Sequence, residues 1–203
     1  MNIAAVLLAA GASKRFGENN KLLSDLGGKP LIRRVAEAIV YSGVEVVVVT
    51  GCDRLQIERA LEGLPLRFAH NLNWESGMGS SIAVGVMALS QQTQGAFVIL
   101  GDLPFLTSDL IKDLTAVFME SRGALITYPT TSKGKQRNPV LWPRRFFPSL
   151  AALSGSSGAK QLLQNCEDSQ KQAAHVLDEG AFIDVDMPAD LEAARSRWNT
   201  ANP

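Results

Sequence analysis

Short apolar runs alternate with segments of helical periodicity along the first half of the chain. The apolar runs are rich in Val, Ile, Leu and Ala and cover residues 3–8, 44–49, 66–69 and 95–100. Such runs are typical of strands that are covered on both faces of a parallel sheet. Between them, apolar residues recur at helical spacing over residues 31–39, 55–61 and 82–89. This alternation predicts an α/β fold with a single Rossmann-like domain and a mainly parallel central sheet.

The second half of the chain continues the pattern less regularly. Thr107 and Asp109 start a predicted helix that runs to about Glu120. Residues 130–138 are polar, basic and rich in turn formers, which indicates a mobile loop over a site. The other elements expected are strands at 125–128, 138–142 and 183–186, short helices at 144–153 and 159–163, and a last helix at 191–198. No internal repeat or interdomain linker interrupts the chain, so residues 1–203 are expected to form one domain.

Composition excludes several classes of protein. The chain has 203 residues, of which 46% are hydrophobic, and its 20 basic and 20 acidic residues balance to a formal charge of zero. This balance gives no support for a protein that binds nucleic acid or a membrane surface. Cys52 and Cys166 are far apart and there are only two His, which argues against a disulfide scaffold and a zinc site. No apolar run approaches ~20 residues and no cation precedes the first one, so we expect a cytoplasmic protein.

The loop after the first apolar run is the first candidate binding site. Ala9, Ala10, Gly11 and Ala12 have almost no side chain, so a ligand could lie against the backbone and meet its N–H groups. Three cations follow: Lys14, Arg15 and Lys21. Small residues and cations in this order suit a polyphosphate. The alternative is a tight turn with solvated basic residues.

Two carboxylates are candidate metal ligands. Asp102 directly follows the apolar run 95–100, and the carboxyl end of a parallel strand is where open α/β sheets bind ligands. Asp102 could coordinate Mg²⁺ there, or it could form an Asx turn with its own backbone. Asp184 and Asp186 occupy alternate positions of the predicted strand 183–186 and should point the same way. Asp186 could instead cap the last helix.

The polar segment 70–81 is a further candidate. It contains Gly77 and leads into the helix expected from about Ile82. Ser80 or Ser81 is placed to cap that helix, whose free N–H groups could equally face a ligand. The alternative is a connecting loop with capping serines. Trp74 and Met78, in the same segment, are expected to be packing residues.

From Val6 to about Arg195 the chain resembles nucleotidyltransferases of the molybdenum cofactor type. The opening L-A-A-G-A-S-K-R-F-G with the following N-K-L-L carries part of this resemblance. The other motifs, in chain order, are G-G-K-P-L, V-V-T-G, N-x-N-W-x-x-G-M-x-x-S, L-G-D-L-P, N-P-V-L and D-V-D-M-P-A-D-L. The chain is most similar to the molybdenum cofactor cytidylyltransferases, whose products serve xanthine-dehydrogenase-type enzymes. The resemblance implies a nucleotide-diphospho-sugar-transferase-like fold, with a nucleotide half at about 1–105 and an acceptor half at about 106–203.

The resemblance also implies a reaction. A family member of this kind transfers CMP from CTP to the phosphate of molybdopterin and releases pyrophosphate. The reaction joins two anions, so positive charge must offset their repulsion. Arg15 would hold the β- and γ-phosphates, Lys21 would neutralise the α-phosphate, and Asp102 and Asp186 would share Mg²⁺. No protein nucleophile or strong base is needed because the acceptor is already anionic, which is consistent with the scarcity of His.

The nucleobase and ribose would lie between two segments of the nucleotide half. By resemblance, the first is the backbone of Leu8, Ala9, Ala10 and Gly11, and the second is the loop from Gly77 to Ser81. Relatives that use GTP usually show L-A-G-G where this chain shows L-A-A-G. Ala10 therefore favours CTP.

Departures from the family pattern lie mainly in the acceptor half. Arg137 stands before N-P-V-L, where relatives carry Gly. The family pattern L-x-G-D-x-G-A-R reads L-S-G-S-S-G-A-K over residues 153–160, so a carboxylate is lost and Lys160 replaces Arg. A lysine is a point charge and cannot bind a phosphate with the planar fork of an arginine. The acceptor itself is the part of the prediction most affected.

Other functions remain open at this point. Within the same class, the chain could be a guanylyltransferase that uses GTP, or a cytidylyltransferase for another phosphorylated acceptor. A non-catalytic carrier or chaperone for the molybdenum cofactor belongs to a different class. The set of Arg15, Lys21, Asp102 and Asp186 argues against a carrier, which has no use for triphosphate and metal ligands.

Overall fold

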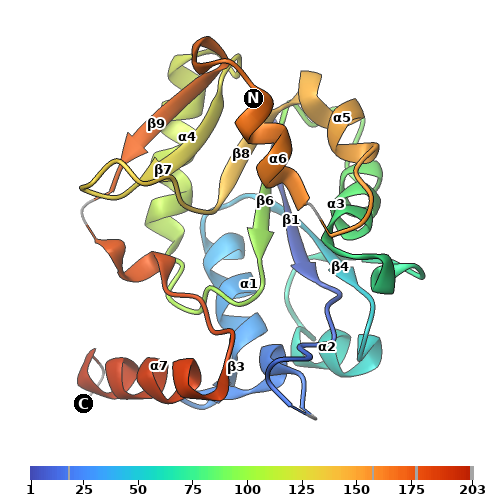
Figure 1. Cartoon of the computed structure of the whole chain (residues 1–203), viewed down its shortest axis with the longest axis vertical. Coiled ribbons are helices and arrows are strands. Elements are labelled where there is room, and N and C mark those ends of the chain that lie inside the picture. Colours follow the sequence, from blue (N-terminus) through green and yellow to red (C-terminus); the bar gives the residue numbers. More distant parts are fainter. Residues whose placement is uncertain (18, 157, 177, 202–203) are drawn as a thin grey trace.

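A mixed sheet forms the centre of the computed structural model, which describes residues 1–17, 19–156, 158–176 and 178–201 (Figure 1). Seven strands from these residues lie in the order β5-β4-β1-β6-β8-β7-β9. Their bounds are β1 Ile3–Ala9, β4 Glu45–Thr50, β5 Arg67–His70, β6 Gly95–Leu100, β7 Ile126–Thr130, β8 Val140–Pro143 and β9 Lys171–His175. Only β8 runs antiparallel to its neighbours β6 and β7. The prediction of a Rossmann-like, mainly parallel sheet is confirmed.

The strand order reverses at β1. β4 and β5 lie on one side of β1, whereas β6 lies on the other. In open α/β sheets, ligands bind outside the carboxyl ends of the strands at such a reversal. Leu8 is in register with Leu100, and the amide of Gly101 donates to the Leu8 carbonyl at 3.1 Å. The segments that follow β1 and β6 therefore leave the sheet side by side.

Helices cover both faces of the sheet (Figure 1). α1 (Leu31–Tyr41), α2 (Arg54–Ala60) and α4 (Ser108–Glu120) pack on one face, and α3 (Met78–Met87), α5 (Phe147–Ala151) and α6 (Gly158–Asn165) on the other. The shorter 3-10 helices are η1 Lys21–Leu23, η2 Trp74–Ser76, η3 Arg144–Phe146, η4 Asp168–Gln170 and η5 Glu179–Phe182. Within the described ranges, none of the helices has the length and apolar character needed to cross a bilayer.

A third, smaller apolar cluster lies at the end of the sheet. It joins α7 (Pro188–Ala201) to the hairpin of β2 (Asp25–Leu26) and β3 (Lys29–Pro30), and α7 lies beside β3 at the bottom of Figure 1. Val185, which is fully buried, belongs to this cluster. The cluster therefore fixes the backbone immediately before Asp186.

Helix α3 begins at Met78, four residues earlier than expected. Ser80 and Ser81 consequently lie inside the helix, and the prediction that one of them caps it is wrong. The N-cap position is Gly77, at φ 118° and ψ −179°, which carries no capping side chain. Glycine adopts this φ without the steric cost that other residues meet. Ser80 instead donates its Oγ hydrogen to the Gly77 carbonyl at 2.8 Å.

Two elements near the C-terminus also differ from expectation. β9 was not predicted, because the sequence Lys-Gln-Ala-Ala-His of residues 171–175 lacks the β-branched and aromatic residues typical of strands. Parallel pairing with β7 makes it a strand. Residues 183–186 are not a strand, although the Val185 amide donates to the Asp102 carbonyl at 3.0 Å. Buried and more exposed positions still alternate there as predicted, since Val185 is buried and Asp184 and Asp186 are not.

Residues 131–137 form a turn that is held at both ends. The Thr131 amide donates to the Lys135 carbonyl at 3.0 Å, and the Arg137 amide donates to the Pro129 carbonyl at 2.9 Å. Glu179 Oε1 also accepts hydrogen bonds from the amide and hydroxyl of Ser132 at 3.1 and 2.9 Å. The movement of this segment over a site stays a prediction.

We expect Gly85→Ala to destabilise the fold. A Cβ atom at Gly85 would overlap Cγ1 of Val6 and lie 2.8 Å from Cγ2 of Val49, both in the buried sheet. The free energy of unfolding should fall by about 1–3 kcal/mol, although alanine favours helices over glycine by about 1 kcal/mol. Urea unfolding followed by circular dichroism measures the change.

The matched control is Met87→Ala in the same helix. Met87 is 67% exposed, so its truncation should change the free energy of unfolding by less than about 0.5 kcal/mol. Equal midpoints for the two variants would contradict the close packing of α3 on the sheet.

Candidate active site

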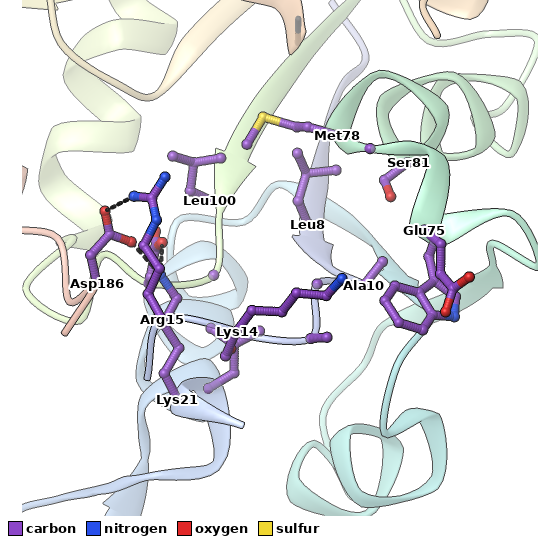
Figure 2. Close-up of a pocket in the computed structure, with 18 residues that line it drawn as sticks. Leu8, Ala10, Lys14, Arg15, Lys21, Glu75, Met78, Ser81, Leu100 and Asp186 are labelled. Atoms are coloured by element: carbon purple, nitrogen blue, oxygen red, sulfur yellow. Dashed lines mark hydrogen bonds and ion pairs between the residues drawn. The ribbon is translucent and has the colours of Figure 1, made fainter. Parts of the chain in front are cut away.

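A cavity of about 420 Å³ opens where β1 and β6 end (Figure 2). Small-molecule sites typically measure about 300–1,000 Å³. Its walls come from the end of β1 and the loop at 10–15, from η1, from η2 and the start of α3, and from residues 100–102. Asp186 joins them from the segment before α7. The cavity therefore lies at the strand-order reversal, where the fold predicts a ligand.

One end of the cavity is charged. Lys21 Nζ donates to Asp102 Oδ2 at 2.7 Å and to Asp186 Oδ1 at 2.6 Å. Arg15 extends from the loop after β1, with Nη1 4.0 Å from Asp186 Oδ2, and its side chain is 82% exposed. Figure 2 shows Arg15 and Asp186 facing each other on this side, while Lys14 extends across the cavity. The fold thus brings together the four residues that the resemblance assigns to phosphate and metal binding.

Burial and charge act against each other in this group. Burial lowers the pKa of Lys21, but Asp102 and Asp186 outweigh it, so the net pKa lies above the usual lysine value. Burial raises the pKa of Asp102 above its ordinary value despite the nearby ammonium. The hydrogen bond from Lys21 lowers the pKa of the more exposed Asp186. Lys21 is therefore cationic at neutral pH despite its burial.

Asn20 holds the backbone from which Lys21 extends. It is 6% exposed, and its Oδ1 accepts hydrogen bonds from the Leu22 amide at 3.0 Å and the Ser13 hydroxyl at 3.1 Å. Its Nδ2 donates to Asp53 Oδ2 at 3.0 Å and to a backbone carbonyl of the loop after β1 at 3.4 Å. One amide side chain therefore ties together η1, that loop and the turn after β4.

The opposite end of the cavity is mostly apolar, although Lys14 extends toward it (Figure 2). It is lined by Gly77, Met78 and Ser81 of the α3 start and by Trp74 of η2. Ser81 is 5% exposed, and its Oγ accepts a hydrogen bond from the buried Asn71 at 3.0 Å. Trp74 packs so closely on Gly51 that a Cβ there would lie 2.7 Å from the Trp74 Cβ. This end has a closely packed wall that a planar group could lie against.

All but one of the predicted site residues line this cavity. Those that do are Leu8, Ala10, Gly11, Arg15, Lys21, Gly77, Ser81, Asp102 and Asp186. Ala9 is placed elsewhere: side chains alternate along β1, so its methyl group is buried in the core on the α1 face.

Sequence reasoning missed other residues of the lining. Trp74 and Met78 were expected to be packing residues only, yet both line the cavity, and Met78 is 45% exposed. Glu75 lines it as well, and Figure 2 shows Glu75 on the side opposite Arg15. Lys14, which the sequence placed among the cations of the candidate loop, also lines the cavity. Trp74 and Met78 belong to the motif N-x-N-W-x-x-G-M-x-x-S, which is the signal that could have identified them.

The carboxylates of Asp102 and Asp186 fit a magnesium ion that is shared with a substrate. Mg²⁺ is usually held by one or two carboxylates together with phosphate oxygens and waters. Asp102 Oδ1 is buried and has no hydrogen-bond partner among the described residues, so it could serve as a ligand. No group of three or more His, Cys, Asp or Glu able to hold a metal occurs in the described part of the chain. Two carboxylates completed by a nucleotide are therefore a better match than an all-protein cage.

A second cavity of about 540 Å³ adjoins the first, since Met78 and Leu100 line both. Its inner walls are apolar side chains of α3, β6, β8 and α6, among them the fully buried Trp142. Arg137 and Lys160 supply positive charge, together with Lys135. Arg137 and Lys160 are the two cations that replace other residues of the family pattern, and both line this second cavity. Ser157, within the same motif as Lys160, lies outside the described residues.

Comparisons with known proteins find similar sequences along most of the chain. The family model described as "MobA-like NTP transferase domain" matches residues 5–174. The chain is 30% identical to a probable molybdenum cofactor guanylyltransferase of Natronomonas pharaonis over 95% of this chain and 96% of that protein. It is also 30% identical to nicotine blue oxidoreductase of Paenarthrobacter nicotinovorans over 80% of this chain and 81% of that protein.

Solved structures support the fold. A nucleotidyl transferase from Methanothermobacter thermautotroptrophicus superimposes with a TM-score of 0.83 at 21% identity, over 99% of each chain. The expected nucleotide-diphospho-sugar-transferase-like fold is confirmed.

We expect Asn20→Ala to loosen the charged end of the cavity. The variant removes four hydrogen bonds and leaves the Leu22 amide without its partner, so the free energy of unfolding should fall by about 1–3 kcal/mol. Chemical unfolding measures this loss.

Asn19→Ala is the matched control, since Asn19 is the exposed neighbour of Asn20. Its effect should stay below about 0.5 kcal/mol. If Asn20→Ala were as mild as Asn19→Ala, the network around Asn20 would not stabilise the loop.

Proposed function

The chain belongs to the MobA-like NTP transferase family and is a nucleotidyltransferase, and on this basis we propose that it transfers CMP from CTP to the phosphate of molybdopterin with Mg²⁺. The observation that carries the proposal is the meeting of Arg15, Lys21, Asp102 and Asp186 at one end of the first cavity. A nucleoside triphosphate needs cations for its phosphates and carboxylates for its metal at one place. The rest of the cavity leaves room for the ribose and base.

The proposed reaction is a direct displacement. An oxygen of the acceptor phosphate attacks the α-phosphorus of CTP and forms the new P–O bond. The bond from the α-phosphorus to the bridging oxygen breaks, and pyrophosphate leaves with that electron pair. No proton has to be removed from the acceptor, so the main task of the protein is electrostatic. Lys21 neutralises the α-phosphate, and Arg15 binds the β- and γ-phosphates.

Asp102 and Asp186 would hold the magnesium ion. When bound, Mg²⁺ supplies positive charge to the triphosphate and helps to orient it. Asp102 is fixed by its position after β6, while Asp186 is fixed by the buried Val185 next to it. The two carboxylates are thus held in place before the nucleotide arrives.

The second cavity is the proposed acceptor site. It shares a wall with the first, so an acceptor phosphate held there could reach the α-phosphorus. Lys135, Arg137 and Lys160 would attract an anionic acceptor, and the apolar walls would cover a pterin ring. Delivery of the product to a xanthine-dehydrogenase-type enzyme rests on resemblance alone.

The nucleotide is the point at which a second candidate has specific support. A relative that is 30% identical over nearly the whole chain bears the name of a guanylyltransferase, which favours GTP. Ala10 favours CTP, because its methyl group lies in the cavity wall where GTP-using relatives carry glycine.

We expect pyrophosphate release from CTP to exceed release from GTP, ATP and UTP. The assay contains Mg²⁺ and molybdopterin, either free or loaded with molybdenum. Ala10→Gly should raise the ratio of GTP to CTP turnover by about tenfold, the effect of roughly one methyl-sized contact in a base pocket.

Each alternative has its own result in this assay. A preference of the wild-type protein for GTP would make it a guanylyltransferase with the same mechanism. Pyrophosphate release that does not depend on molybdopterin would show that molybdopterin is not the acceptor. No release from any nucleotide, together with pterin binding, would favour a cofactor carrier.

We expect Asp102→Asn to keep the fold and lower turnover at least about 100-fold, because a neutral amide is a poor magnesium ligand and no longer balances the charge of Lys21. Asp109→Asn, on the exposed first turn of α4, is the matched control and should leave turnover unchanged. Thermal melting checks that both variants are folded. Wild-type activity in a folded Asp102→Asn protein would rule out Asp102 as a metal ligand.

A further inference from the structure

Lys21 lies where a cation bound by both carboxylates would lie. Its Nζ is 2.7 Å from Asp102 Oδ2 and 2.6 Å from Asp186 Oδ1, distances typical of charge-assisted hydrogen bonds. The side chains of Lys21 and Asp102 are 14% and 16% exposed, so water weakens this contact little. Both carboxylates therefore direct one oxygen to the same ammonium group.

This arrangement conflicts with a metal ion on the same pair. Mg²⁺ needs carboxylate oxygens at about 2.0–2.1 Å. Lys21 leaves the Asp102 Oδ1 oxygen without a partner among the described residues, but a divalent cation bound there would lie close to the Lys21 ammonium, and the two cations would repel each other. The repulsion falls if Lys21 moves away from the carboxylates, so its departure would favour the binding of a metal to both.

Lys21 can leave without a change in the backbone. It begins η1, whose backbone is held by Asn20, whereas its four-carbon side chain has several rotatable bonds. A triphosphate in the cavity would offer the ammonium a new anionic partner. Arg15 lies 4.0 Å from Asp186 and is 82% exposed, so it holds the carboxylates less closely than Lys21 does.

We propose that Lys21 makes divalent-metal binding depend on the nucleotide. Its ammonium competes with the metal for Asp102 and Asp186, and the α-phosphate releases it. The metal alone then binds weakly, whereas the metal and the nucleotide bind together. This inference rests on the proposed function, because it takes the two carboxylates to be the metal ligands.

The test measures Mn²⁺ binding to the full chain without nucleotide, using the electron paramagnetic resonance signal of free Mn²⁺. Lys21→Met should bind Mn²⁺ about tenfold or more tightly than the wild-type protein, within the range typical of coupled binding equilibria. Lys21→Gln, which keeps a polar side chain, should show the same direction and serves if Lys21→Met does not fold.

Lys14→Met is the matched control. It removes one positive charge from the same cavity, but no ion pair of Lys14 is present among the described residues. Mn²⁺ affinity should therefore change by less than about threefold, as expected for the loss of an exposed, screened charge. If Lys14→Met and Lys21→Met raised Mn²⁺ affinity equally, the loss of positive charge alone would explain the gain. That result would overturn the proposal.

Addition of Asp102→Asn separates this inference from the proposed function. In the double variant with Lys21→Met, the gain in Mn²⁺ affinity should disappear. Lys21→Met could bind Mn²⁺ no more tightly than the wild-type protein while Asp102→Asn still weakens Mn²⁺ binding. The competition would then be wrong, but Asp102 would remain assigned as a metal ligand. If Asp102→Asn has no effect on Mn²⁺ binding in the Lys21→Met background, where the ammonium is absent, the metal assignment fails and the competition fails with it.

Discussion

The double hydrogen bond from Lys21 to Asp102 and Asp186 is the interaction on which the site depends. Lys21 is separated by 81 and 165 residues from these partners, so only the complete fold can bring them together. Each partner has its own support: Asn20 holds the start of η1, Asp102 follows the end of β6, and the buried Val185 fixes the segment before α7. The three supports are independent, which gives the site a defined geometry without a metal cluster built from protein alone.

A balanced net charge is compatible with this strongly charged site. The formal charge of the chain is zero, yet Lys14, Arg15 and Lys21 gather at one cavity, and further cations line the next. Local placement, rather than overall charge, supplies the field that a phosphate transfer needs. The two cavities share Met78 and Leu100, so the charged end, the apolar end and the adjoining cationic cavity form one continuous region.

The buried strands could be predicted because they are covered on both faces, which requires apolar residues at every position. β1, β4 and β6 were therefore found to within one or two residues. β9 could not be found, because it becomes a strand through its pairing with β7 and not through its own residue types. The start of α3 was misplaced since Gly77 reaches the N-cap position by its backbone conformation, whereas the sequence suggested a serine cap.

The sequence alone determined which residue types were available at the site: small residues, Arg15 and Lys21 after one strand, and a carboxylate after another. It also determined the layers of the fold, because apolar runs and helical periodicity are local properties. The tertiary structure decided where each side chain points. In the folded chain, the side chain of Ala9 points into the core, whereas Trp74 and Met78 line the cavity. Lys21 lies between two carboxylates. Side-chain direction and contacts between distant segments depend on packing, and local sequence patterns do not contain them.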